Sequence, residues 1–132
     1  MSAVAQATLE RWIGDWAVAA QECFPGFIPD RWQARGLRAI GSRKPLSRVA
    51  FKACAGPGKS AEMAIASMLA MLLQSRKDAY HVSYVLSITK DNLMANLWRE
   101  ITIWYGRSPV MQEVFELTAS ELRSREHPGE WW

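Results

Sequence analysis

The feature that most restricts how this chain can fold is a short glycine-rich turn that ends in a lysine and a serine. Residues 53–60 read Ala-Cys-Ala-Gly-Pro-Gly-Lys-Ser, and the last three match the end of the P-loop pattern, G-x-x-x-x-G-K-[ST]. Ala53 stands where that pattern begins with glycine, although Gly56 keeps the loop flexible inside. A strand is predicted before the turn, over residues 48–54, and a helix after it, over residues 59–74. This context favours a phosphate-binding turn over a glycine-rich turn whose lysine and serine only face solvent.

In such a turn, successive backbone N–H groups hold phosphate oxygens, and the start of the following helix adds a positive partial charge. Gly58 lets the backbone approach the phosphates, because no side chain stands in the way. Lys59 would reach the β- and γ-phosphates as the catalytic cation, and the Ser60 hydroxyl would ligate Mg²⁺. The residues expected to bind the nucleotide around the turn are Ala55, Gly56, Pro57, Gly58, Lys59 and Ser60.

Helical and strand-like patterns alternate along the rest of the chain. Apolar residues three or four positions apart predict helices, alternating β-formers predict strands, and Pro, Gly, Asp and Ser mark their ends. The expected order is helix 5–24, helix 31–40 capped by Asp30, strand 48–54, helix 59–74, strand 81–88, a helix capped by Thr89 or Asp91, helix 109–114, and strands near 115–117 and at Trp131. This order predicts an α/β fold, with a parallel sheet, flanking helices and right-handed crossovers.

The chain has 132 residues, enough for one compact domain. We expect residues 1–45 to form a helical segment that leads into a P-loop α/β core over residues 46–132. A P-loop ATPase also needs an acidic residue after a buried strand, to hold Mg²⁺ and to activate water. Asp91 is better explained as a helix cap, and Glu116 follows only two apolar residues. We therefore expect an incomplete sheet that stops before the acidic strand, and half of a catalytic site.

Net charge and cysteine content exclude few functions. The formal net charge is +3, and the stretch 31–52 holds seven basic residues and no acid, which suits a solvated face or an anion-binding surface equally well. The two cysteines are expected to be reduced thiols. Met1–Leu9 does not resemble a signal peptide, and the longest apolar run, 63–73, is about half of a membrane span. A soluble, cytoplasmic protein that does not enter membranes is expected.

Several segments together resemble the N-terminal ATPase domain of phage terminase large subunits, the motors that pump DNA into procapsids. The likeness covers most of the chain from about residue 25 onward. Its segments are the strand and P-loop at 48–60, the Asp-Asn-Leu at 91–93 with Asn-Leu-Trp-Arg-Glu at 96–100, the Pro-Asp-Arg-Trp-Gln at 29–33, and the run 127–131. Many nucleotide hydrolases share the P-loop, so the segment 96–100 and the upstream Trp-Gln narrow the likeness to this family.

The resemblance also implies roles for single residues. Gln33 would hydrogen-bond the adenine edge with Trp32 packed beside it, although a surface glutamine and a core tryptophan are equally plausible. Lys52 stands where many terminases place a phosphate-binding arginine, but a lysine cannot make the bidentate contact. Thr89 and Asn92 would lie at the ligand-binding end of the second strand, or serve only as helix caps.

If the resemblance holds, the chain is the ATP-binding portion of a motor that couples ATP hydrolysis to translocation of double-stranded DNA. DNA would be gripped through its phosphates, independently of sequence. The terminase small subunit, the portal and further copies of the chain in a ring are the implied partners, and a nuclease domain would lie beyond Trp132. Two alternatives stay open: another P-loop enzyme, such as a helicase-like ATPase or small kinase, and a truncated protein that binds nucleotide or a partner without turnover.

Overall fold

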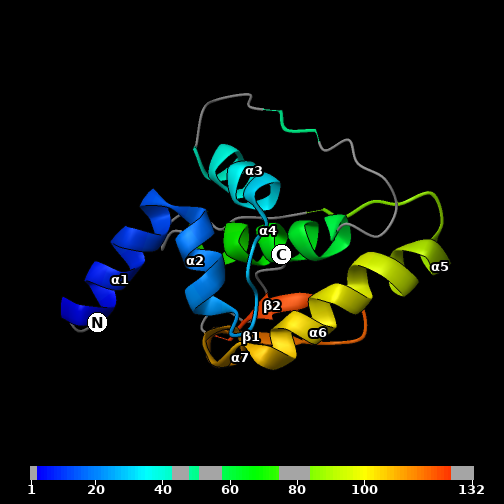
Figure 1. Cartoon of the computed structure of the whole chain (residues 1–132). Helices are drawn as coiled ribbons and strands as arrows, with labels where there is room; N and C mark the ends of the chain where they lie inside the picture. Colours follow the sequence, from blue (N-terminus) through cyan, green and yellow to red (C-terminus); the bar gives the residue numbers. More distant parts are fainter. Residues whose placement is uncertain (1–2, 43–47, 51–57, 75–83, 126–132) are drawn as a thin grey trace.

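The computed structural model describes residues 3–42, 48–50, 58–74 and 84–125, and most of these residues are helical (Figure 1). Strands β1 and β2 form a two-stranded antiparallel sheet, in which Phe115 lies opposite Ser124 and Leu117 lies opposite Leu122. In chain order the elements are α1 (Ala3–Gly14), α2 (Trp16–Cys23), α3 (Arg31–Gly41), α4 (Lys59–Gln74), α5 (Lys90–Leu93), the π-helix η1 (Met94–Trp98), α6 (Arg99–Arg107), α7 (Pro109–Val114), β1 (Phe115–Leu117) and β2 (Leu122–Ser124).

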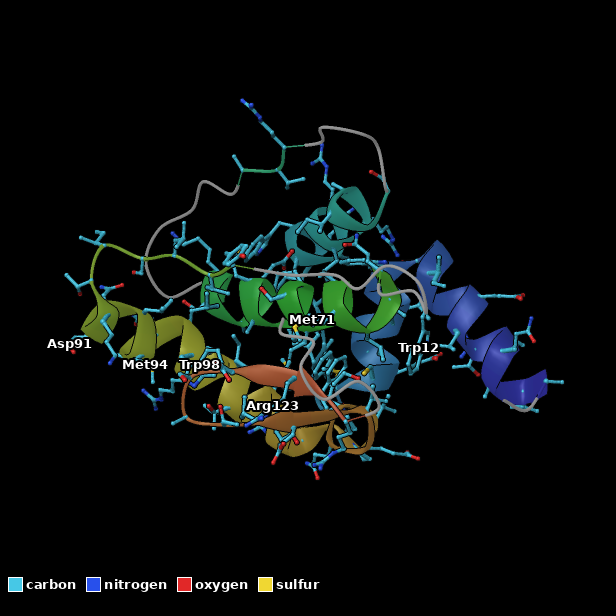
Figure 2. All side chains as sticks on the ribbon, turned by 180° about the vertical axis from the view of Figure 1, so that it is seen from behind. Trp12, Met71, Asp91, Met94, Trp98 and Arg123 are labelled. Carbon is cyan, nitrogen blue, oxygen red and sulfur yellow. The ribbon has the colours of Figure 1, made fainter. Side chains whose placement is uncertain are left out.

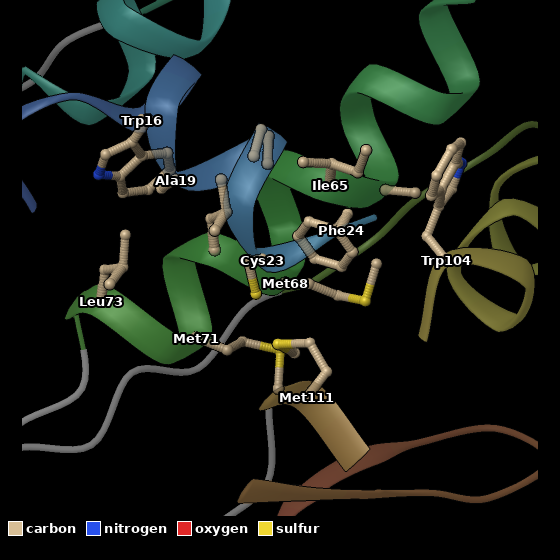
Figure 3. Packing of buried hydrophobic residues seen from close by; sticks show 14 of the residues in the cluster. Trp16, Ala19, Cys23, Phe24, Ile65, Met68, Met71, Leu73, Trp104 and Met111 are labelled. Atoms are coloured by element: carbon tan, nitrogen blue, oxygen red, sulfur yellow. The ribbon is translucent and has the colours of Figure 1, made fainter. Parts of the chain in front are cut away.

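Helix α4 occupies the centre of the described structure because it is apolar on nearly every side. It packs against α1, α2, α3, η1 and α6, with α3 on one side and α6, α7 and the β1–β2 sheet on the other (Figure 1). Ile65, Met68 and Met71 of α4 meet Phe24, which directly follows α2, and Met111 of α7 in the core (Figure 3). Each large apolar side chain buried here contributes about 1.5–3 kcal/mol relative to exposure. Within the described ranges, no helix is long and apolar enough to cross a membrane.

The single helix predicted over residues 5–24 is wrong, because the chain breaks it between α1 and α2. Asp15 has an extended conformation, with φ −149° and ψ 101°, and its Oδ1 accepts hydrogen bonds from the backbone N–H groups of Ala17 and Val18. The same carboxylate receives the Arg38 Nε at 3.2 Å. Asp15 therefore caps α2 and also ties it to α3.

The helix predicted after Thr89 is present as one helical run through α5, η1 and α6 (Figure 2). Thr89 is its N-cap, since its Oγ1 accepts the backbone N–H of Asn92 at 3.1 Å. Ser108 separates α6 from α7, and its Oγ accepts the N–H of Met111 while donating to the carbonyl oxygen of Cys23. The helix predicted over 109–114 and the strand predicted at 115–117 are confirmed, as are the helices predicted at 31–40 and 59–74.

The parallel sheet stays a prediction. Residues 48–50 and 84–88 belong to the two expected strands, but they form no ladder with any other described residue, and β1 and β2 are antiparallel. The rest of both expected strands, 51–54 and 81–83, lies outside the described residues, as does Trp131. Alternate side chains of the second segment, those of Tyr84, Leu86 and Ile88, are 86%, 88% and 94% exposed. The described part of the protein therefore leaves one apolar row uncovered.

We expect Gly41→Ala to destabilise the protein. A Cβ at Gly41 would lie 2.5 Å from two ring atoms of Trp16, which is 1% exposed and cannot move aside. Overpacking of this kind costs about 1–3 kcal/mol. Gly106→Ala is the matched control, because Gly106 lies within α6 and has no atom within 4 Å of such a Cβ. Chemical denaturation should show a loss of unfolding free energy for the first variant and none for the second. Equal stabilities would contradict the packing described here.

Candidate functional site

The start of α4 opens onto a cavity of about 200 Å³. Lys59 and Ser60 line it from α4, and Ser87, Asn92 and Asn96 supply the polar part of the opposite wall. The apolar part of the lining is made by Met63, Leu86, Leu93 and Leu97. The last two residues of the predicted phosphate-binding turn thus meet the end of the second predicted strand and the helical run after it.

The local backbone suits the approach of an anion. Gly58 has φ +94°, a conformation that glycine adopts without steric cost, and it leads directly into α4. Its carbonyl oxygen accepts the backbone N–H of Glu62 at 3.1 Å, which closes the first helical turn. The N–H groups at the start of a helix and its dipole favour negative charge. Together with the ammonium of Lys59, they make this end of the cavity electropositive.

The opposite wall is held by a small hydrogen-bond network around Asn92. The Ser87 hydroxyl donates to Asn92 Oδ1 at 2.7 Å, and Asn96 Nδ2 donates to the Asn92 carbonyl oxygen at 3.0 Å. The N-cap Thr89 also contacts Asn92, since its Oγ1 accepts the Asn92 backbone N–H. Sequence reasoning named Thr89 and Asn92 but gave no role to Ser87 or Asn96. The spacing of four between the two asparagines was the available signal, since it places both on one helix face.

The cavity fits phosphate groups and a magnesium ion better than a whole nucleotide. Its volume is below the roughly 300–1,000 Å³ of pockets that enclose entire small-molecule ligands. Hydroxyl and amide oxygens are hard ligands of the kind Mg²⁺ prefers, but none of the described lining residues carries a carboxylate. A search of the described residues finds no group of three or more His, Cys, Asp or Glu that could hold a metal. A magnesium ion here would therefore depend on the phosphates for most of its charge compensation.

Of the remaining predicted site residues, the structure describes only Trp32 and Gln33. Gln33 does not line the cavity, and it is buried at 5% exposure beside Gly58, with its Nε2 donating to the Gly58 carbonyl oxygen at 3.1 Å. Trp32 is half-buried and does not line the cavity. Lys52, Ala55, Gly56 and Pro57 lie outside the described residues. The structure thus brings the predicted adenine-recognition segment against Gly58, at the end of the predicted phosphate-binding turn.

Glu62, three residues after Lys59, is a further residue to which the sequence pattern assigned no role. It is fully buried in the first turn of α4, and neither of its carboxylate oxygens has a hydrogen-bond partner among the described residues. Burial raises the pKa of this carboxyl to about 7. Glu62 is not among the described residues that line the cavity. A single glutamate within an apolar helix was its only sequence signal.

Among the described residues, two other titratable groups have shifted pKa values, and neither residue lines the cavity. Hydrogen bonds from the Trp12 indole and the Arg11 guanidinium lower the pKa of Glu22. Burial raises the pKa of the Cys23 thiol to about 11, while a contact with the Ser108 hydroxyl opposes that rise. Cys23 is a free, buried thiol and is poorly reactive at neutral pH. Neither group is a candidate for chemistry.

We expect Glu62 to make the protein less stable as pH rises. Its pKa is about 7 in the folded protein against 4.5 for an ordinary glutamate, so the folded state retains a proton that the unfolded chain releases. The free energy of unfolding should fall by about 3 kcal/mol between about pH 4.5 and 7 and stay at the lower value above pH 7. Glu62→Gln should remove this dependence. Urea unfolding at a series of pH values would show the variant more stable than the wild type at pH 8 and similar near pH 4.5.

Glu113→Gln is the control for this experiment, because Glu113 is exposed on α7. Its stability should follow that of the wild type at each pH within about 0.5 kcal/mol. Parallel curves for the wild type and Glu62→Gln between pH 5 and 8 would show that the buried carboxyl does not titrate as described.

Comparison with known proteins adds no relative from which function could be transferred. No protein-family model, curated protein or solved structure matches the chain. The likeness to terminases consequently rests on the residues quoted for it. The side chains that the fold gathers around the start of α4 are the remaining observation that bears on function.

Proposed function

We propose that this chain binds ATP–Mg²⁺ through the N-terminus of α4, as the nucleotide-binding portion of a DNA-packaging motor of the terminase large subunit type. The observation that carries the proposal is the cavity in which Lys59 and Ser60 face Ser87, Asn92 and Asn96. A lone Gly-Lys-Ser turn is a weak signal. Here the polar side chains of Ser87, Asn92 and Asn96 lie across a small cavity from Lys59 and Ser60. This arrangement supports a binding site over a turn that only faces solvent.

The binding chemistry follows from the residues at the two walls. The ammonium of Lys59 compensates phosphate charge, and the first N–H groups of α4 donate to phosphate oxygens. The Ser60 hydroxyl is the proposed protein ligand of Mg²⁺, which lowers the charge of the phosphates when it is bound. On the other wall, the Asn92 side-chain amide can donate to a phosphate, because only its oxygen is used by Ser87. The base and ribose would lie outside the cavity.

The proposed partner of the motor is double-stranded DNA, contacted through phosphates. Arg31 and Arg35 are exposed on α3, and Arg48 is exposed after it, so these three cations are the described candidates for such contacts. Arg38 is already paired with Asp15. Such contacts carry no sequence information and weaken with salt. A terminase small subunit, a portal and a ring of copies of this chain complete the proposed assembly, in the cytoplasm of a bacterial host.

The second candidate function is nucleotide binding without turnover, and a specific observation favours it. None of the described residues that line the cavity is an aspartate or a glutamate, and Glu62 is not one of these lining residues. Hydrolysis in P-loop enzymes needs an acidic group for Mg²⁺ and a residue that orients water. A helicase-like ATPase shares the same binding chemistry and would need the same groups.

Lys59→Ala should abolish the stabilisation that Mg-ATP gives to the wild type. The substitution removes the cation from the cavity and leaves the apolar core of α4 intact. Lys90→Ala is the control, since Lys90 is exposed on α5 and does not line the cavity. A thermal-shift titration with Mg-ATP should raise the unfolding midpoint of the wild type and of Lys90→Ala, but not that of Lys59→Ala. Equal shifts in all three proteins would refute a phosphate site at Lys59.

Turnover by the 132-residue chain itself should be essentially zero. A sensitive assay of phosphate release, run at protein concentrations where Mg-ATP binding is saturated, distinguishes the two candidate functions. Release that is lost in Lys59→Ala would mean that an acidic group outside the described residues completes the site. Such a result would also exclude the binding-only alternative.

A further inference from the structure

One side of α3 carries a row of arginines. Arg31, Arg35 and Arg38 are all exposed, and the helix contains no acidic residue. Because they lie four and three residues apart, they fall within roughly 60° of one another around the helix axis. Leu37 of the same helix is fully buried, and α3 packs against α2 and α4 (Figure 1). These three exposed residues are called the arginine row below.

The arginine row does not stabilise the helix that carries it. Like charges three or four residues apart on a helix repel each other. Arg31 is also the first residue of α3, where the helix dipole disfavours a cation, although the N-cap Asp30 offsets part of this effect. The ion pairs found among the described residues include neither Arg31 nor Arg35. Because a bound anion would offset the mutual repulsion, the row fits an anionic partner better than a role in folding.

The ion pair between Arg38 and Asp15 leaves most of the guanidinium available. Arg38 Nε donates to both carboxylate oxygens of Asp15, at 3.2 Å to Oδ1 and 3.4 Å to Oδ2. The two Nη groups donate no hydrogen bond within the described ranges, and 57% of the Arg38 side chain is exposed. Asp15 is itself held in place as the N-cap of α2. Arg38 is therefore a third cation of the row, with both Nη groups available to a phosphate.

The length of the row fits the backbone of a nucleic-acid duplex. From Arg31 to Arg38 the axis of α3 advances by about 10 Å, since each helical residue adds about 1.5 Å. One strand of a duplex carries a phosphate about every 3.4 Å along the duplex axis. Three guanidinium groups on one helix face can therefore contact phosphates of a single strand at the same time. Each guanidinium can bind its phosphate through two N–H groups.

Single strands and anionic membranes fit the row less well. Sites for single strands add exposed aromatic side chains on which the bases stack, but Trp32, the aromatic residue of α3, is half-buried. A helix that binds a lipid surface inserts an apolar face beside its basic face. The apolar side of α3, which includes Leu37, is already buried in the core.

We propose that the arginine row is the surface on which the chain holds double-stranded DNA, with Arg31, Arg35 and Arg38 each contacting a phosphate of one strand. The proposal rests on the proposed function for its choice of partner. It adds the ion-paired Arg38 to the contact and assigns the contact to one face of one helix. None of the three arginines lines the cavity at the start of α4, so DNA and Mg-ATP would not compete.

The test measures binding of a labelled DNA duplex of mixed sequence by fluorescence anisotropy over a series of salt concentrations. For the wild type, the logarithm of the association constant should fall against the logarithm of the salt concentration with a slope of about −2.7 or steeper, for three phosphate contacts. Arg35→Gln and Arg38→Gln should each make this slope shallower by about 1 and weaken binding equally for duplexes of different sequence.

Two other arginines serve as matched controls, because each substitution lowers the net charge by the same amount. Arg11→Gln matches Arg38→Gln, since Arg11 is also exposed and ion-paired, with Glu22. Arg99→Gln matches Arg35→Gln, since Arg99 is exposed on α6. Both controls should keep the salt slope of the wild type. If Arg38→Gln does not fold, Arg35→Gln and its control still test the surface.

Wild-type salt slopes in Arg35→Gln and Arg38→Gln, or equal losses in the controls, would overturn the arginine row while leaving DNA as the partner. A wild type that binds no duplex even at low salt would refute the DNA partner of the proposed function itself. Tighter binding to a single strand of the same length would overturn the choice of a duplex. So would tighter binding to vesicles of phosphatidylcholine and phosphatidylserine that is lost in Arg35→Gln, because the row would then belong to a membrane contact.

Discussion

Burial of α4 is the interaction on which the rest of the structure depends. The helix is apolar on most sides, and α2, α3 and α6 all bury their own side chains against it. Because α4 is held along its whole length, its first turn is held as well, and Lys59 and Ser60 begin from a fixed backbone. The candidate site thus obtains its rigidity from hydrophobic packing and needs few polar contacts of its own.

The same packing explains why a carboxyl group is found in the core. Glu62 lies on the face of α4 that continues through Ile65, Ala66 and Leu69, all of which are buried. A charged carboxylate at such a position would cost several kcal/mol, so the side chain instead retains its proton to near neutral pH. The region next to the candidate site is therefore less stable than its apolar packing alone would provide.

Local signals in the sequence predicted the helices well, because caps and breakers act within a few residues. Asp30, Thr89 and the Ser108-Pro109 pair mark helix starts that the structure confirms. The break at Asp15 was missed because Asp15 lies within a helical apolar pattern, and its partner Arg38 is distant in sequence. The Gln33–Gly58 contact and the wall at Ser87 were also beyond local reasoning, since tertiary packing creates both. The predicted parallel sheet depends on pairings that involve residues outside the described ranges.

The alternating row of Tyr84, Leu86 and Ile88 has a consequence for how the protein behaves at high concentration. These large apolar side chains are all exposed, so together they form an apolar row on the surface of the described structure. Such a row gains free energy when another apolar surface covers it, including the same row on a second molecule. Self-association should therefore begin at this row, beside the cavity that Leu86 also lines.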